Sequence, residues 1–362
     1  MSALPTAYFN PPQRLPFVLP TPPEGRRLVS LAINESAFGC SPLALEAGRR
    51  RLEEPNRYPD PSSAELRAAI GEALSLDPER IVCGNGSEEL LDVIGRMFAR
   101  PGDEILISQS GFFQFAVVAQ RVGATLKRAP ERDLVTDVDA LLGLVGPETK
   151  IVFLAVPNNP TGTVLPATEV ARLAEALFPQ VVLVLDLAYG EYLPPGELAA
   201  LMALASSSER IIVTRTFSKA HGLAALRAGW LLAPLWMTPG LNLLRGVGNV
   251  NAIAQAAAAA AIRDTDFIAE VVTRTAVERE FLSAALDRLG LFHVRGLGNF
   301  LLTRFHDAPG GTVADFLPFA MAEAGIWLRP VGEPGFDNHS RLGLGTRQEN
   351  RLLVATLERF LS

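Results

Sequence analysis

The stretch RIIVTRTFSKAHGLAALRAGW (residues 210–230) decides how this chain folds and where its chemistry lies. It opens with an apolar strand, continues into a polar turn with Thr216, Ser218 and Lys219, and reaches Arg227 shortly before a second apolar run. Lys219 is therefore expected at the end of a strand and not on a solvated helix face. Two hydroxyls, a primary amine and a guanidinium in one turn suit a phosphorylated carbonyl ligand, because the amine can form an imine while the other groups hold the phosphate.

Lysine is rare in this chain, and nearly all of its other basic residues are arginine. Lys127, Lys150 and Lys219 are the only candidates for chemistry that needs a primary amine. Lys127 lies beside Arg128 in a predicted strand, and Lys150 directly precedes another strand. We interpret both as ordinary lysines at the rim of a sheet, which leaves Lys219 as the candidate nucleophile.

Short apolar runs alternate with stretches of helical periodicity from about residue 81 to residue 235. The predicted strands are IVCG (81–84), EILIS (104–108), ATLKR (124–128), KIVFLAV (150–156), VVLVLD (181–186), RIIVTR (210–215) and GWLLA (229–233). Apolar strands between amphipathic helices predict an α/β fold with a mostly parallel sheet sandwiched by helices. In such sheets ligands bind at the carboxyl ends of the strands, so the polar residues that follow each strand are the candidates for function.

Asp186 ends one of these strands, in VVLVLDLAYGEYL (181–193). A buried carboxylate needs a cationic or hydrogen-bonding partner, and the protonated ring nitrogen of a pyridine is one such partner. A helix cap or a turn is the alternative role for this aspartate.

Two further strand ends carry candidate binding groups. In VPNNPTGTVL (156–165), Asn159 precedes a proline and is held extended, so that its amide is free to bind a ring oxygen. In CGNGSEELLDVI (83–94), a Gly-Asn-Gly turn leads into a helix whose first backbone N–H groups, around Ser87 and Glu88, form an anion site. Taken alone, the second pattern also fits an ordinary helix start.

The length of 362 residues is enough for two domains. Residues 1–32 are rich in proline, and we expect an extended N-terminal arm there. A large ligand-binding domain is expected at 33–250 and a smaller α+β domain at 251–362, where shorter strands and helices are mixed.

Composition excludes several classes of function. The net charge is −6 and no block of basic residues occurs, which argues against a nucleic-acid partner. No apolar run is long enough to span a membrane and no signal peptide precedes the fold, so we expect a cytoplasmic protein. Cys40 and Cys83 indicate no disulfide framework, and the four histidines lack the spacing of metal ligands.

Together these segments resemble the fold type I enzymes that use pyridoxal 5'-phosphate (PLP), in the class I and II aminotransferase group, with the closest likeness to histidinol-phosphate aminotransferases. The resemblance covers roughly residues 30 to 362. It is carried by NESAFGCSP (34–42), YPDPSSAELRAAI (58–70), GNGSEELLDVIGRMFARPGDEIL (84–106), NNPTGT (158–163), DLAYGEY (186–192), RTFSKAHGLAALRAGW (215–230) and RLGLGTRQENRLL (341–353).

This resemblance implies a role for each matching residue. Lys219 would bond the cofactor as a Schiff base and shuttle the reacting proton, and Asp186 would pair with the ring nitrogen. Asn159 and Tyr189 would bind the ring hydroxyl, and Phe112 would stack on the ring. The remaining cofactor ligands would hold its phosphate: Ser87, Glu88, Thr216, Ser218, Arg227 and, from the other subunit of a homodimer, Tyr58. The substrate-binding residues would be Asn34, Arg329, Arg341 and Phe17, with Arg341 on the substrate carboxylate.

Three departures from the family pattern bear on the substrate. Phe17 takes the place of an arm tyrosine that binds the substrate phosphate, and phenylalanine cannot donate that hydrogen bond. Leu187 replaces an acidic residue, and SGFFQFAVV (110–118) is more apolar than the family segment. An aromatic amino acid therefore competes with histidinol phosphate as the expected amino donor.

The expected reaction is a ping-pong transamination between an amino acid, or histidinol phosphate, and a 2-oxo acid. One alternative is PLP-dependent decarboxylation of a phosphorylated amino acid, as in threonine-phosphate decarboxylases, which share most of these motifs. A second alternative is a PLP-binding sensor without catalysis, but such sensors follow a DNA-binding module. Only about 30 residues precede the matching region here.

Overall fold

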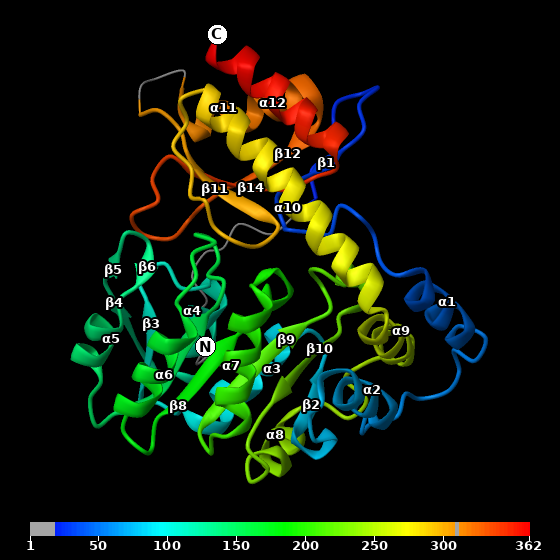
Figure 1. Cartoon of the computed structure of the whole chain (residues 1–362), viewed down its shortest axis with the longest axis vertical. Helices are drawn as coiled ribbons and strands as arrows, with labels where there is room; N and C mark the ends of the chain where they lie inside the picture. Colours follow the sequence, from blue (N-terminus) through cyan, green and yellow to red (C-terminus); the bar gives the residue numbers. More distant parts are fainter. Residues whose placement is uncertain (1–18, 308–310) are drawn as a thin grey trace, which may run out of the picture.

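The computed structural model describes residues 19–307 and 311–362. Most of the expected N-terminal arm, including Phe17, lies outside the described residues. The chain forms a larger part built on a wide sheet and a smaller part stacked on it, as Figure 1 shows. The long helix α10 (Thr265–Arg288) runs from the larger part along the smaller one.

The wide sheet confirms the expected α/β fold. Of its seven strands, β10 alone runs antiparallel to its neighbours, and the other pairs are parallel. The strands in spatial order are β2 (Ile81–Gly84), β10 (Gly229–Leu232), β9 (Ile211–Thr216), β8 (Val182–Asp186), β7 (Thr149–Ala155), β3 (Glu104–Ser108) and β4 (Thr125–Ala129).

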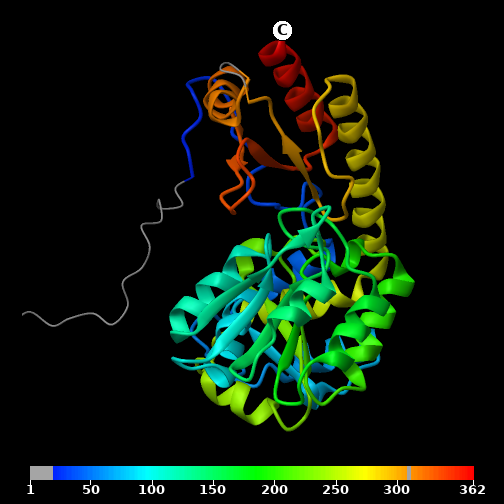
Figure 2. The same ribbon diagram turned by 90° about the vertical axis from the view of Figure 1, so that its left-hand side faces the viewer.

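The central strands are apolar throughout because both faces of the sheet are covered. In β7, Ile151 and Phe153 pack into one core while Val152 and Leu154 pack into the other. Helices cover both faces in Figure 2, and burying this apolar surface is the main favourable contribution to folding. On one face lie α3 (Ser87–Phe98), α4 (Phe113–Val122) and α8 (Thr238–Leu244). On the other lie α1 (Pro42–Arg51), α2 (Ala64–Leu74), α5 (Val138–Leu144), α6 (Ala167–Ala176), α7 (Pro195–Ser206) and α9 (Ala252–Arg263).

The smaller part has a core of its own, formed by side chains of α10, a three-stranded sheet and two further helices. Thr312 and Thr346 begin these two helices with capping boxes, in which each threonine bonds the backbone three residues on. The elements are β11 (Phe300–Arg304), β14 (His339–Gly343), β13 (Arg329–Pro330), α11 (Val313–Ala324) and α12 (Arg347–Leu361).

The N-terminal segment joins the two parts. Its strand β1 (Val29–Ser30) pairs in parallel with β12 (Ile326–Trp327) of the smaller part, and the chain then passes over the larger part to α1. The remaining elements are the hairpin β5 (Glu131–Arg132) and β6 (Val135–Thr136) and the short helices η1 (Pro78–Arg80), η2 (Gly190–Tyr192) and η3 (Ala224–Leu226). Among the described helices, none combines the length and the apolar composition needed to cross a membrane.

Candidate active site

Three of the predicted site segments follow neighbouring parallel strands. Asn159 follows β7, Asp186 ends β8 and Lys219 follows β9, and these strands lie side by side in the sheet. Their carboxyl ends meet at one edge, beneath the smaller part. The sheet topology therefore brings together residues that lie 60 positions apart in the sequence.

The Lys219 amine lies among backbone groups of the N-terminal segment. Its Nζ donates hydrogen bonds to the carbonyl oxygens of Ile33 and Asn34 at 3.1 Å and 3.2 Å, and it lies 5.8 Å from the centroid of the Tyr189 ring. Burial, and secondarily the positive charge of Arg341, lower the pKa of the Lys219 amine to about 7. A large share of this amine is therefore neutral, and nucleophilic, near neutral pH.

Asp186 is a buried carboxylate, only 3% exposed. It accepts a hydrogen bond from Thr214 Oγ1 at 2.9 Å, on the adjacent strand β9. Burial raises the pKa of the Asp186 carboxyl to about 6, although the bond from Thr214 opposes that shift. Within the described part of the chain neither Asp186 nor Lys219 has an ion-pair partner, so both charges are available to a ligand.

Tyr189, Asn159 and Arg341 surround the same space. The Tyr189 hydroxyl accepts a hydrogen bond from Asn34 Nδ2 at 2.8 Å. Arg341 donates from Nη1 to Asn159 Oδ1 and from Nη2 to the carbonyl of Ala32, both at 2.7 Å. Its buried Nε has no partner among the described residues, and neither has Asn34 Oδ1. These orphaned groups can bind a polar ligand without first breaking a bond.

A tight cradle lies where β9 and β10 meet the start of α3. Arg227 Nη1 donates to Ser218 Oγ at 3.2 Å, and a Cβ on Gly86 would lie 2.4 Å from Arg227 Nη2. A Cβ on Gly229 would lie 2.5 Å from the backbone nitrogen of Ser87, the first residue of α3. Glycine therefore keeps a guanidinium, a hydroxyl and a helix N-terminus close together, which is the donor set of a phosphate site.

The structure places the other predicted site residues as follows. Glu88 is in the first turn of α3, and Thr216 Oγ1 accepts from the backbone of Ser218 at 3.1 Å. Phe112 precedes α4 and packs edge-to-face against Phe113 and Phe115. Arg329 lines the same cavity as Arg341. Tyr58 is 97% exposed, and among residues 19–307 and 311–362 no contact joins it to the centre.

A buried charged cluster beneath the Lys219 turn was not predicted from the sequence. Glu191 Oε1 contacts Arg215 Nη2 at 2.6 Å and His221 Nε2 at 3.4 Å, and all three side chains are buried. Although burial opposes it, the Arg215 guanidinium lowers the pKa of the Glu191 carboxyl to about 2. The cluster ties the segment after β8 to the segment after β9. The signal available beforehand was an arginine inside an otherwise apolar strand, which needs a buried partner.

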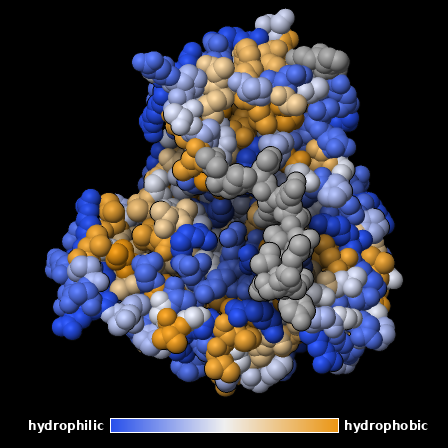
Figure 3. Space-filling view, turned by 180° about the vertical axis from the view of Figure 1, so that it is seen from behind, coloured by the Kyte–Doolittle hydropathy of each residue, from blue (hydrophilic) through white to orange (hydrophobic). Residues whose placement is uncertain are grey.

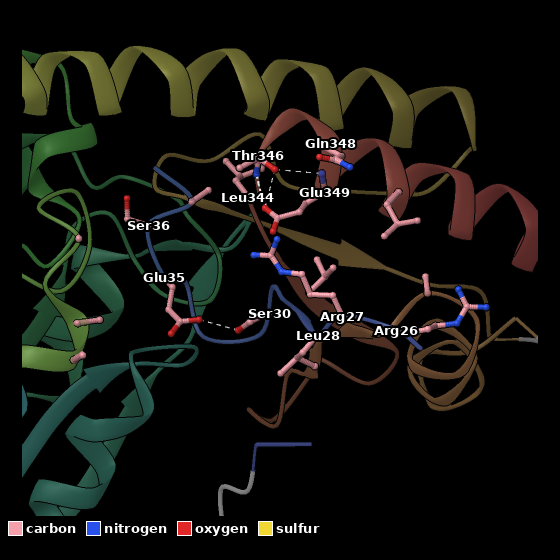
Figure 4. Close-up of a pocket in the computed structure, with 18 of the residues that line it drawn as sticks. Arg26, Arg27, Leu28, Ser30, Glu35, Ser36, Leu344, Thr346, Gln348 and Glu349 are labelled. Atoms are coloured by element: carbon pink, nitrogen blue, oxygen red, sulfur yellow. Dashed lines mark hydrogen bonds between the residues drawn. The ribbon is translucent and has the colours of Figure 1, made fainter. Parts of the chain in front are cut away.

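The segment that supplies the two carbonyl groups to Lys219, residues 30–36, is also held by a contact of its own. A cavity of about 840 Å3 lies beside this segment. Figure 4 shows Glu35, one of the residues that line it, directed toward Ser30. Ser30 Oγ donates to Glu35 Oε2 at 2.8 Å, and the negative charge of Glu35 slightly favours the charged form of Lys219. This contact steadies residues 30–36 over the site.

The model of the family "Aminotransferase class I and II" matches residues 26–357. The chain therefore belongs to this family of aminotransferases, as its parallel sheet and its lysine at a strand end indicate.

Within the family the chain is similar to histidinol-phosphate aminotransferases. It is 41% identical over 343 residues to that of Rhodopseudomonas palustris strain HaA2, covering 95% of this chain and 94% of the relative. It is 43% identical over 335 residues to that of Paramagnetospirillum magneticum, covering 92% of each. The crystal structure of histidinol-phosphate aminotransferase from Sinorhizobium meliloti in complex with pyridoxal-5'-phosphate superposes with a TM-score of 0.87 at 30% identity, covering 92% of this chain and 90% of that one.

The protein is accordingly a transaminase that uses PLP as its cofactor. Its residues fit that group on structural grounds. The buried carboxylate of Asp186 matches a ring N–H, the Lys219 amine with its lowered pKa matches an aldehyde, and the cradle at Gly86 and Arg227 matches a phosphate. No group of acidic, histidine or cysteine side chains in the described residues could hold a metal ion.

Proposed function

We propose that this enzyme transfers the amino group of histidinol phosphate to a 2-oxo acid. The observation that carries the proposal is a cavity lined by both Arg329 and Arg341. Two guanidiniums suit a phosphate monoester, which carries close to two negative charges at neutral pH. The relatives named as histidinol-phosphate aminotransferases support this choice of donor.

We propose that the cofactor is held by the residues at the strand ends. Asp186 would bind the ring nitrogen, Asn159 and Tyr189 the ring hydroxyl, and Phe112 one face of the ring. The phosphate ligands would be Ser87, Glu88, Thr216, Ser218 and Arg227. PLP supplies an aldehyde that reacts with amines and a ring that accepts electrons from the substrate α-carbon.

The protein then supplies positioning and proton transfer. Lys219 Nζ removes the proton from the substrate α-carbon, which its neutral form can do near pH 7 because its pKa is lowered to about 7. Arg341 holds the anionic group of the substrate, and Asn34 keeps Tyr189 in place through its 2.8 Å hydrogen bond. Asp186 keeps the cofactor ring nitrogen protonated. Placing these groups before reaction lowers the entropic part of the barrier.

We propose that the enzyme works as a homodimer in which Tyr58 reaches the cofactor phosphate of the other subunit. Leu243 and Val247 support this, because they are 85% and 94% exposed while Tyr58 is 97% exposed. Pro59 lies beside Gly248, which brings the chain at Tyr58 close to the chain at Val247. We further propose that the enzyme is cytoplasmic, since Cys40 and Cys83 are both free thiols.

Product analysis tests the proposed donor. Purified enzyme, loaded with PLP, is given histidinol phosphate and 2-oxoglutarate, and the oxo product and glutamate are quantified. Rapid formation of both in equal amounts is expected, with phenylalanine a much poorer donor. Phenylalanine reacting at least as fast would overturn histidinol phosphate as donor. Release of carbon dioxide from phosphothreonine without glutamate formation would favour the decarboxylase alternative.

A further inference from the structure

The cavity that holds Arg329 and Arg341 also contains a carboxylate. Glu333 lies on the loop between β13 and β14 and lines this cavity together with Phe113 and Pro160. Figure 1 shows that loop reaching down from the smaller part toward the β5–β6 hairpin. The lining of this cavity therefore includes two positively charged residues and one negatively charged residue.

The charge of Glu333 is not neutralised by a direct contact. In the described residues its carboxylate has no hydrogen bond and no ion pair, and the residue is only half-buried. The negative charge of Glu333 nevertheless acts electrostatically on Arg341 and Arg128. Burial lowers the pKa of each guanidinium, and the charge of Glu333 partly restores both values. Arg329 acts on Arg341 in the opposite sense.

We propose that Glu333 sets the net charge of this anion subsite, reducing two positive charges to one, and so limits how strongly the enzyme prefers a phosphate dianion over a carboxylate monoanion. The inference rests on the proposed function, in which a phosphorylated amine and a carboxylate-bearing partner occupy the same subsite in turn. A site of charge +2 would hold the dianion too tightly for the carboxylate partner to compete. Glu333 is thus a specificity-determining residue and not a catalytic one.

The physical signature of this role is a dependence on ligand charge. Removing one negative charge changes the electrostatic potential at the anion by a fixed amount, and the energy change is that potential multiplied by the ligand charge. The affinity for a neutral ligand should not change. The logarithm of the affinity should rise by one increment for a monoanion and by two such increments for a dianion. A contribution through shape or folding would change all three ligands without regard to charge.

The test uses Glu333→Gln and three compounds that share one imidazole and one amine: histidinol, histidine and histidinol phosphate. Apparent dissociation constants come from the cofactor absorbance of the PLP-loaded enzyme, without an acceptor. For histidine we expect binding about 3- to 10-fold tighter in the variant, and for histidinol phosphate the square of that factor. Binding of histidinol should not change. Raising the ionic strength should shrink both gains, because salt screens a half-exposed charge.

Asp337→Asn is the matched control, because Asp337 lies on the same loop but does not line the cavity. It removes the same charge and should leave all three dissociation constants unchanged. An equal change for all three ligands in Glu333→Gln, or a charge-dependent gain in Asp337→Asn, would overturn the inference. Turnover of histidinol phosphate by the unmodified enzyme is measured separately. Failure of that turnover contradicts the proposed donor, while the dissociation constants still decide the role of Glu333.

Discussion

At the scale of single residues, the candidate site is marked by Lys219 and Asp186, two buried ionisable groups without an ion-pair partner among the described residues. The sequence singles out Lys219 and Asp186 as candidates because Lys219 follows an apolar strand and Asp186 ends one, at the edge of the sheet where ligands bind. Glu191 and Glu333 could not be predicted, because nothing in their local sequence distinguishes them from other glutamates. Glu191 contacts Arg215 in β9, 24 residues further along the chain, and the charge of Glu333 acts on Arg341 in β14, the next strand along the chain. Roles that depend on tertiary contacts remain invisible until the chain is folded.

The lowered pKa of Lys219 predicts a pH-dependent cost to the cofactor-free enzyme. The amine is protonated in the unfolded chain up to about pH 10.5 but in the folded chain only up to about pH 7. Stability of the folded state should therefore rise with pH between these values, and the penalty should be complete below pH 7. Lys219→Met removes the penalty, so it should stabilise the apoenzyme strongly near pH 6.5 and little near pH 10.

Urea unfolding of both apoenzymes across this pH range measures the difference. Lys150→Met is the control, because Lys150 also donates to a backbone carbonyl, that of Pro147, but at the surface. It should show no such dependence. A stabilisation by Lys219→Met that is the same at every pH would contradict a buried amine with a lowered pKa.

At the scale of elements, the sequence predicted the strands and helices of the sheet well, because burial on both faces leaves an unmistakable apolar pattern. The direction of β10 was not separately predictable, since an antiparallel strand in the middle of a covered sheet has the same composition. The short segment IWLRP (326–330) does not form one strand but divides into β12 and β13. Its first residues pair with β1 and Arg329 pairs with β14, so one short segment serves two sheets. Pairing partners of this kind cannot be read from local periodicity.

The contact between β10 and α3 predicts the effect of one added methyl group. Gly229→Ala would place its Cβ 2.5 Å from the Ser87 nitrogen and 2.7 Å from the Gly86 carbonyl carbon, and neither backbone atom can move freely. We expect a loss of about 1–3 kcal/mol in stability and weaker retention of PLP, because the displaced atoms belong to the phosphate cradle.

Thermal unfolding and equilibrium dialysis of PLP check this expectation. Gly143→Ala in α5 is the control, because a Cβ there meets nothing within 4 Å. That change should stabilise the protein by about 0.5–1 kcal/mol, as alanine does inside a helix, and leave cofactor binding intact. Equal PLP affinity in both variants would show that the cradle does not hold the phosphate.

At the scale of the whole molecule, the surface carries exposed apolar side chains that do not belong to the core of the single chain. Figure 3 shows apolar side chains on the flank of the larger part that carries α1, where Leu43, Leu45 and Leu52 are exposed. The division of the chain at residue 250 stays a proposal, because α9 follows that position in sequence yet packs against α1 and α2 of the larger part.

A mixed dimer tests the proposed contribution of Tyr58 across the interface. Tyr58→Ala and Lys219→Ala should each be nearly inactive as pure proteins. When the two are co-expressed, a mixed dimer contains one site with both an intact Lys219 and the partner's Tyr58, so activity should return to about a quarter of the normal value at random pairing. Recovery of no activity, with mixed dimers demonstrably present, would contradict the shared site.

The central claim is that Lys219, of the three lysines in this chain, forms the covalent bond to the cofactor. Borohydride reduction of the PLP-loaded enzyme makes that bond permanent, and mass spectrometry of its peptides then locates the added mass. We expect the whole of the label on the peptide that contains Lys219. Label on Lys127 or Lys150, or a protein that takes up no label, would contradict it.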